Sequence, residues 1–260
     1  MTRVSVITVC LNAAATIERT LRSIRSQKDV AIEHIVIDGG STDGTLAILE
    51  RHRDTIAHLV SEPDTGLYDA MNKGLALATG EFVGFLNADD AFAAPDVIEG
   101  LMRVATRTGS DAVYGDVLQV DAYDRASRLI KGAAMPARGL RRGLMPPHPA
   151  FYARTHILRA AGGFDTSYRR AADFDLMARL FRDPGFRAAH RPGVVTLMRL
   201  GGLSTQGVKG TYAASLEILR SCRANGIDVT RWSVLSRYPL KAREVINGRL
   251  MRLGGWVAPQ

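Results

Sequence analysis

The chain has 260 residues, of which 46% are hydrophobic and 23% are charged, so it can bury one sizeable core. Its formal net charge of +8 suits nucleic acid, a membrane surface or a phosphorylated substrate as partner, although no nucleic-acid recognition motif is present. Its two cysteines lack the spacing of a metal or redox motif, no apolar run reaches the roughly 18 residues of a membrane span, and the first residues lack a signal-peptide layout, all of which fits the cytoplasm.

In the first half, short apolar runs alternate with amphipathic segments. Runs of β-branched and apolar residues predict strands, and apolar residues spaced by three and four predict helices. The expected strands are 4–9, 33–38, 56–60 and 82–86, and the expected helices follow Asn12 as a cap, follow Thr45, and span 66–78 and 95–106. Four strand–helix units joined by short loops predict an α/β fold with a parallel, doubly wound sheet.

The second half is less regular. Residues 111–116 predict a strand, and 117–121 with 128–131 predict a hairpin. A strand over 149–153, a helix over 173–180 and a last strand over 194–200 follow. Beyond these lie helical segments, the final one around 231–253, in which Pro239 is expected to interrupt the helix.

Carboxylates gather where the strand 82–86 ends. Asn87, Ala88, Asp89 and Asp90 follow it directly, and Asp38 ends an earlier strand. Because ligands bind at the carboxyl ends of strands in such sheets, these residues are expected on one rim. Their oxygens suit Mg²⁺ or Mn²⁺ serving substrate phosphates. The alternative is a solvated loop, with Asp38 bonded to its own turn.

Four stretches together resemble family 2 glycosyltransferases: the opening strand 4–9, the turn 38–45, the run 61–74 and the run 85–90. The resemblance covers roughly residues 3–200. It implies the GT-A fold, an α/β domain with a mostly parallel central sheet flanked by helices. It also implies a catalytic domain over 1–205, divided into a nucleotide-binding half 1–110 and an acceptor-side half 111–205, and a helical extension over 206–260.

The same resemblance implies the residues that bind the donor. Asp38 matches the acid that recognises the nucleotide base, and further nucleotide contacts are implied for Thr8, Asn72, Asn87 and Ala88. Asp89 matches the metal-binding acid of the D-x-D motif, with Asp90 beside it, and Mn²⁺ or Mg²⁺ is the implied cofactor. The first acid of that motif is here Asn87, which brings no charge.

Two residues of the second half also acquire roles from the resemblance. Asp173 matches the general base at a helix start, although a helix dipole alone also favours an acid there. His148 matches a contact to acceptor or diphosphate, and a capping or buried histidine is the alternative. Asp175 is expected to pair with Arg179, four residues along the helix.

The implied activity is inverting, non-processive transfer from a nucleotide sugar, UDP-linked more often than GDP-linked, to a glycan or polyprenyl-linked acceptor in bacterial surface polysaccharide or glycolipid synthesis. Processive synthases carry membrane spans and a Gln-x-x-Arg-Trp motif, both missing here. Two alternatives are an inactive nucleotide- or glycan-binding module and a sugar-phosphate nucleotidyltransferase. The latter needs a glycine-rich loop where residues 12–15 read Asn-Ala-Ala-Ala.

The C-terminal segment is basic and carries aromatic residues. That composition fits contact with the anionic inner face of the plasma membrane, as a peripheral protein. A helix packed on the domain with its charged side in water explains it equally well, so both interpretations stay open.

Overall fold

The computed structural model describes residues 2–132, 139–200, 207–230, 232–233 and 236–253. The strands are β1 (Arg3–Cys10), β2 (Ala31–Asp38), β3 (His58–Ser61), β4 (Phe82–Phe85), β5 (Ala91–Phe92), β6 (Ala112–Val120), β7 (Ala126–Ile130), β8 (Phe151–Arg154) and β9 (Ala188–Arg199). The α-helices are α1 (Ile17–Arg25), α2 (Thr45–Arg51), α3 (Leu67–Leu77), α4 (Val97–Thr108), α5 (Thr155–Ala160), α6 (Ala172–Arg182), α7 (Gly207–Ala224) and α9 (Arg237–Leu253). Short 3₁₀ turns are η1 (Arg53–Thr55), η3 (Leu140–Arg142) and η4 (His148–Ala150).

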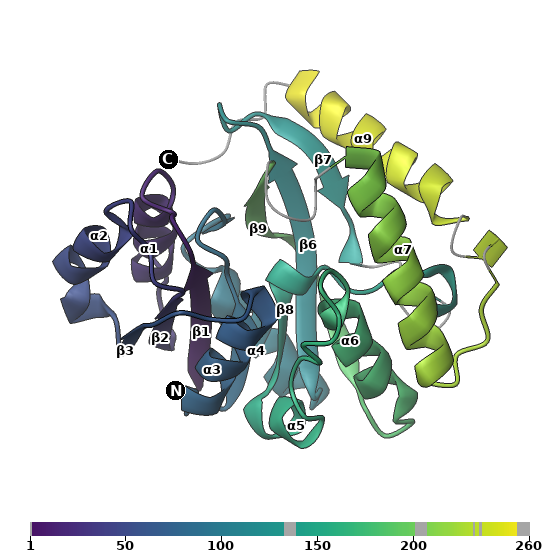
Figure 1. The fold of residues 1–260 in the computed structure, drawn as a ribbon, viewed down its shortest axis with the longest axis horizontal. Helices are drawn as coiled ribbons and strands as arrows, with labels where there is room; N and C mark the ends of the chain where they lie inside the picture. Colours follow the sequence, from purple (N-terminus) through teal and green to yellow (C-terminus); the bar gives the residue numbers. More distant parts are fainter. Residues whose placement is uncertain (1, 133–138, 201–206, 231, 234–235, 254–260) are drawn as a thin grey trace.

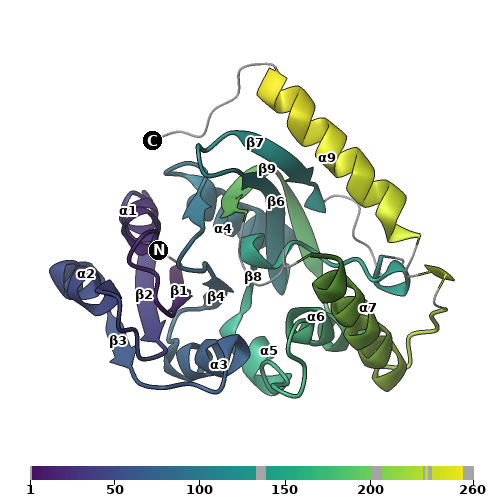
Figure 2. The same cartoon turned by 45° about the horizontal axis from the view of Figure 1, so that its top comes forward.

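One mixed sheet organises these elements (Figures 1 and 2), with the order β3-β2-β1-β4-β8-β6-β9-β5 and with β7 paired to β6. Strands β3, β2, β1 and β4 are parallel, as the alternation in the first half predicts. In the second half β8 runs antiparallel between β4 and β6, while β9 returns parallel to β6. The expected hairpin is confirmed as β6 and β7. Strand β5 and helix α5 were not expected.

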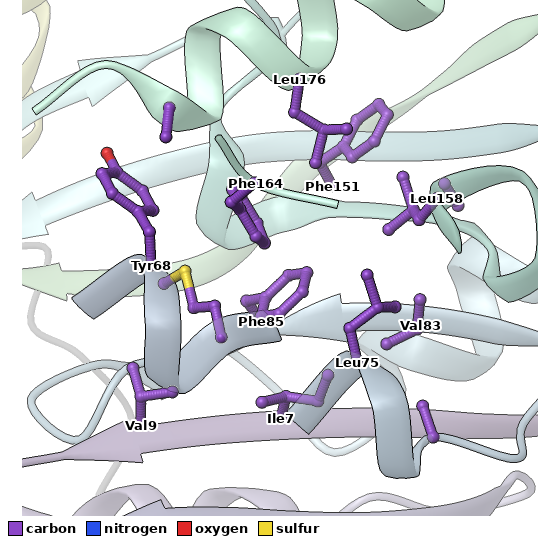
Figure 3. Packing of buried hydrophobic residues seen from close by; sticks show 14 of the residues in the cluster. Ile7, Val9, Tyr68, Leu75, Val83, Phe85, Phe151, Leu158, Phe164 and Leu176 are labelled. Atoms are coloured by element: carbon purple, nitrogen blue, oxygen red, sulfur yellow. The ribbon is translucent and has the colours of Figure 1, made fainter. Parts of the chain in front are cut away.

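Helices cover both faces of the sheet. Helices α3, α5 and α6 pack over one face through a cluster that includes Ile7, Phe85 and Phe164 (Figure 3), and α1 and α4 pack over the other through Ile24 and Leu101. A Cβ on Gly74 would lie 2.5 Å from Ile7 Cγ2, so a glycine lets α3 lie close to β1. This close packing fixes the N-terminal end of α3 at the carboxyl edge of the sheet.

Two local predictions are wrong. Asn12 does not cap a helix: α1 begins at Ile17, and Asn12 adopts a φ of 51° while its side-chain oxygen accepts the backbone N–H of Thr42 at 2.9 Å. Pro239 does not interrupt a helix either, because α9 begins at Arg237 and proline is tolerated within a first turn.

The C-terminal helices belong to the same body as the sheet. Helix α7 packs on α6 through an apolar cluster that includes Phe174, Ile218 and Cys222. Helix α9 lies along β7 (Figure 1), where Glu244 accepts a hydrogen bond from Arg128 Nε at 2.9 Å. The expected boundary between 205 and 206 lies outside the described residues, and the domain limits stay predictions. None of the helices described has the length and apolar character needed to cross a membrane.

Candidate active site

The carboxyl ends of β1, β2 and β4 meet at one edge of the sheet. Cys10 pairs with Asp38 and Asp38 pairs with Ser61, so β1, β2 and β3 end level with one another. Strand β4 lies on the other side of β1, and residues 87–90 follow its end. The structure therefore brings Asp38 and the acidic run to the edge at which open α/β sheets bind ligands.

Asp38 is fully buried and its carboxylate is saturated with donors. One oxygen accepts the Ser41 hydroxyl and, at 3.5 Å, the Cys10 thiol; the other accepts the Ser41 backbone N–H at 3.0 Å and the Ser61 hydroxyl at 2.7 Å. Burial opposes ionisation, but these hydrogen bonds outweigh it and hold the pKa of Asp38 below its usual value. Through these bonds Asp38 holds the turn after β2, and its predicted contact to the nucleotide base stays a prediction.

A second carboxylate lies beside this turn. A Cβ on Gly39 would overlap the Asp64 carboxylate and would lie 3.5 Å from Leu11 Cδ1, so glycine leaves room for both side chains. Asp64 is partly exposed and accepts the Gly66 backbone N–H at 2.8 Å through Oδ1, and no described residue donates to its Oδ2. Leu11 is 58% exposed. An apolar surface beside a carboxylate oxygen without a donor is thus present at the carboxyl end of β1 and β2.

Two other predicted nucleotide contacts are occupied within the protein. Thr8 is fully buried, with its hydroxyl 3.1 Å from His34 Nε2. The Asn72 amide donates to the Phe164 carbonyl at 2.8 Å and accepts the Phe164 N–H at 2.8 Å, which ties α3 to the segment before α6. Both ends of the Asn72 amide are therefore used within the protein, and the predicted nucleotide contacts of Thr8 and Asn72 stay predictions.

The two acids after β4 differ sharply in environment. Asp90 is 1% exposed and accepts the Arg199 backbone N–H at 3.2 Å, and burial together with the charge of Asp89 raises its pKa well above the usual value. Asp90 thus joins β9 to this loop, and its predicted contact to a metal ion stays a prediction. Asp89 is partly exposed, and burial raises its pKa as well.

Asp89 is the more accessible of the two carboxylates for a divalent ion. Among the described residues no group of three or more His, Cys, Asp or Glu could hold a metal by itself. Asn87 Oδ1 is buried without a hydrogen-bond partner in the described part of the chain, so one further oxygen is free two residues before Asp89. Ala88 between them is buried. Such a sparse set fits Mg²⁺ or Mn²⁺, which commonly bind one or two protein oxygens together with substrate phosphates.

His148 lies in a row of aromatic rings behind this edge. Its ring stacks on Phe85 at 5.4 Å between centroids and meets Phe164 edge-on at 5.7 Å. Burial lowers the pKa of His148 to about 4, so it is neutral at physiological pH. Its Nε2 is buried and has no partner among the described residues, which leaves one polar atom for a ligand or water. The predicted contact to acceptor or diphosphate stays a prediction, as a neutral contact.

Asp173 lies in the first turn of α6 and touches the same aromatic row. Its Oδ1 accepts the Phe174 N–H at 2.8 Å and the Tyr68 hydroxyl at 3.3 Å, and Tyr68 stacks on Phe164 at 5.5 Å (Figure 3). Burial raises the pKa of Asp173 to about 6. A carboxylate with such a pKa holds a proton more strongly than an ordinary aspartate, which is what a general base needs. Tyr68 is a site residue that the sequence pattern did not single out.

Helix α7 anchors the segment that carries Asp173. Glu217 accepts the backbone N–H groups of Arg169 at 3.2 Å, Arg170 at 2.8 Å and Ala171 at 3.0 Å. Within α6, Asp175 pairs with Arg179 at 2.8 Å, as expected, and also accepts hydrogen bonds from Ser221 and Asn225 of α7. The C-terminal extension thus fixes the start of α6 from outside.

The negative charge of Glu217 also contributes, after burial, to the raised pKa of Asp173. We expect Glu217→Gln to move the acid limb of the kcat/KM profile to lower pH with little change in the plateau rate, since its one amide oxygen can still accept the N–H groups of Arg170 and Ala171 and only the longer bond from Arg169 is lost. Glu50→Gln on α2, which removes an exposed charge elsewhere, is the control. If the acid limb of Glu217→Gln stays at the wild-type pH, the charge of Glu217 does not raise the pKa of Asp173.

Comparison with known proteins gives consistent results. The family model described as Glycosyl transferase family 2 matches residues 5–180. A PGL/p-HBAD biosynthesis glycosyltransferase of Mycobacterium bovis is 34% identical over 266 residues, covering 95% of this chain and 98% of that protein. An uncharacterised glycosyltransferase of Mycobacterium tuberculosis is 36% identical over 189 residues, covering 70% of each.

Solved structures share the fold at low sequence identity. TarS of S. aureus, residues 1–349 in complex with UDP-GlcNAc, has a TM-score of 0.67 at 19% identity, over 84% of this chain and 66% of that one. The mannosyltransferase PcManGT of Pyrobaculum calidifontis, in complex with GDP-Man and Mn²⁺, has a TM-score of 0.61 at 19% identity, over 97% of this chain and 87% of that one. The expected GT-A fold is confirmed.

Proposed function

Because this chain belongs to glycosyltransferase family 2, we propose that it is an inverting, non-processive enzyme that moves a sugar from a nucleoside diphosphate sugar to a hydroxyl group of its acceptor. The observation that carries the proposal is Asp173, a partly buried carboxylate with a pKa of about 6. Asp173 accepts a hydrogen bond from Tyr68, whose ring stacks on Phe164, and Phe164 in turn meets Phe85 edge-on. Phe85 lies four residues before Asp89, so these contacts connect Asp173 with the edge of the sheet proposed to bind the donor.

The proposed reaction is a single displacement. Asp173 accepts the proton of the acceptor hydroxyl as the new bond forms between that oxygen and the anomeric carbon. The bond from the anomeric carbon to the diphosphate breaks on the opposite side, so the configuration inverts and the nucleoside diphosphate leaves. The Tyr68 hydroxyl and the Phe174 N–H orient the carboxylate. A positioned base contributes about 10² to 10⁴ in rate.

Asp89 would hold the divalent ion together with the donor diphosphate, and Asn87 supplies a neighbouring oxygen without a partner among the described residues. When bound, such an ion neutralises charge on the leaving diphosphate. The protein's own part is to present the Asp89 carboxylate at the edge of the sheet while Asp90, buried beneath, fixes the loop to β9.

For the acceptor, we propose a glycan or lipid-linked sugar of the bacterial cell surface, with the enzyme at the inner face of the plasma membrane. The relative whose name refers to PGL/p-HBAD biosynthesis matches along nearly its whole length, which supports this class of acceptor. A structural neighbour crystallised with UDP-GlcNAc supports a UDP-linked donor, while another was crystallised with GDP-mannose. The preference for one nucleotide must therefore be argued from the residues of this chain.

We assign base recognition to Asp64 in place of Asp38. Asp38 has no accepting oxygen left, whereas Asp64 Oδ2 has no donor among the described residues and lies beside the exposed Leu11. A carboxylate oxygen accepts the ring N–H of uracil, thymine or guanine and rejects cytosine, whose ring nitrogen is itself an acceptor.

The test is thermal stability with UDP, TDP, GDP and CDP, each with and without Mn²⁺. A nucleotide at about one hundred times its dissociation constant stabilises by about 2.7 kcal/mol, and CDP should give no shift. Asp64→Asn should weaken UDP by about tenfold or more and admit CDP, since an amide can donate to the cytosine ring nitrogen. Glu62→Gln, two residues away on the same loop, is the control. If Asp64→Asn binds UDP as tightly as the wild-type chain does, a residue other than Asp64 recognises the nucleotide base.

A further inference from the structure

Helix α9 has two faces that differ in what they contact. One face packs on the β6–β7 hairpin through Glu244, Gly248 and Met251, which are spaced by four and three residues. A Cβ on Gly248 would overlap the backbone of Ser127 and Arg128, so this face lies directly against β7. Figures 1 and 2 both place α9 at the outer edge of the molecule, alongside β7.

The opposite face exposes large apolar side chains. This face carries Ile246, Leu250 and Leu253, which are also spaced by four and three residues. Each lies two residues after its counterpart on the inner face, which is roughly 200° around a helix at roughly 100° per residue. They are 57%, 60% and 84% exposed. Three large aliphatic side chains along one helical face, this open to water, mark a contact surface more often than a solvated one.

Basic residues border this apolar stripe on both sides. Arg243 and Arg249 are exposed and lie roughly 60° to either side of Ile246 at roughly 100° per residue. The acid of this helix, Glu244, lies on the inner face and is paired with Arg128. The outer face of α9 therefore combines aliphatic side chains with positive charge that no acid of this helix neutralises. A surface that is both apolar and negatively charged fits this face better than a neutral groove of another protein.

We propose that the outer face of α9 binds the surface of an anionic phospholipid bilayer. The helix lies parallel to the membrane, with Ile246, Leu250 and Leu253 entering the boundary between headgroups and acyl chains and Arg243 and Arg249 against lipid phosphates. Charge complementarity selects this partner over a second copy of the chain, whose identical face would repel it. The surface explains the membrane association proposed above, but it rests on α9 and not on the transfer reaction.

Flotation of the full chain with vesicles tests the proposal. The protein should float with vesicles of phosphatidylcholine mixed with phosphatidylglycerol, should float poorly with phosphatidylcholine alone, and should lose binding as salt increases. Leu250→Ser should weaken partitioning by about tenfold, and Arg249→Gln by about fivefold. Because both side chains are exposed, neither change should alter the circular dichroism spectrum.

Matched controls lie elsewhere on the surface. Leu46→Ser on α2 removes an exposed leucine, and Arg107→Gln on α4 removes an exposed arginine, and neither should affect flotation. Three outcomes would overturn the proposal: no binding by the wild-type chain, equal binding to neutral vesicles, or undiminished binding by Leu250→Ser with Ile246→Ser. Concentration-dependent dimerisation that these changes abolish would identify a second copy as the partner. Sugar transfer measured on a soluble acceptor keeps this result separate from the proposed activity.

Discussion

Asp173→Asn is expected to lower kcat for sugar transfer by about 10² to 10⁴ while leaving nucleotide affinity within a few-fold of wild type. The amide cannot take up a proton, but its oxygen can still accept the hydrogen bonds that Tyr68 and the Phe174 N–H now donate to Asp173. The geometry of the site should therefore persist while the base is lost. Transfer rates and nucleotide-induced thermal shifts on the same preparation measure the two quantities separately.

The raised pKa gives this prediction a pH signature. With a pKa of about 6, Asp173 is the active, ionised base above that pH, so wild-type kcat/KM should fall about tenfold per unit below it. Folding stability depends on pH in the opposite direction. Because the pKa of Asp173 is higher in the folded state than in the unfolded state, its contribution to stability is fully present below the unfolded-state pKa and is lost as pH rises through about 6. Asp173→Asn should consequently be more stable than wild type at pH 8, by up to about 3 kcal/mol, and not at pH 4.

Asp165→Asn is the matched control for the base. Asp165 is exposed in the segment before the same helix and accepts the Ser167 N–H at 2.9 Å, a bond that an asparagine oxygen can keep. We expect near wild-type transfer from it. If Asp173→Asn transfers sugar at the wild-type rate, or if Asp165→Asn loses as much, Asp173 is not the base and the proposed displacement needs another acceptor for the proton.

The elements that the sequence predicts best are those whose burial is local. The runs at β1, β2 and β4 are rich in buried β-branched and other apolar residues, so their strands follow from composition. Pairing direction is not local: nothing in Phe151–Arg154 indicates that it inserts antiparallel between β4 and β6. The two-residue β5 is too short to carry any pattern, and it exists because β9 pairs with it.

Within the site, residue type was easier to predict than residue role. A polar run such as Asn87 to Asp90 does not indicate which carboxylate faces solvent, because that depends on β9 supplying the Arg199 N–H beneath it. For Asp38, the turn hydrogen bonds weighed as the alternative are present, joined by Ser61 from the next strand. The sequence does not indicate that Asp64 lies beside Gly39 and Leu11, because that contact depends on how the loop after β3 folds against the turn after β2.

The two adjacent acids after β4 should respond very differently to the same substitution. Asp89→Asn removes the partly exposed carboxylate proposed to hold Mn²⁺ or Mg²⁺, and we expect transfer to fall by about 10² to 10³ and the metal-dependent part of nucleotide stabilisation to disappear. Asp90→Asn replaces a buried carboxyl group, whose pKa is raised by burial and by the charge of Asp89, with an amide of nearly the same shape. Its oxygen can still accept the Arg199 N–H, so transfer and metal dependence should change little.

Titrating Mn²⁺ into each variant at saturating nucleotide separates these roles, with transfer and thermal stability as parallel measurements. Because the residues are neighbours, any general disturbance of the loop should affect both variants, and a difference between them reports the charge itself. If Asp90→Asn shifts the Mn²⁺ midpoint as strongly as Asp89→Asn, Asp90 is ionised and binds metal after all. If neither variant shifts it, the ion is held by the donor diphosphate and by groups outside this loop, and Asp89 serves the sugar or the ribose instead.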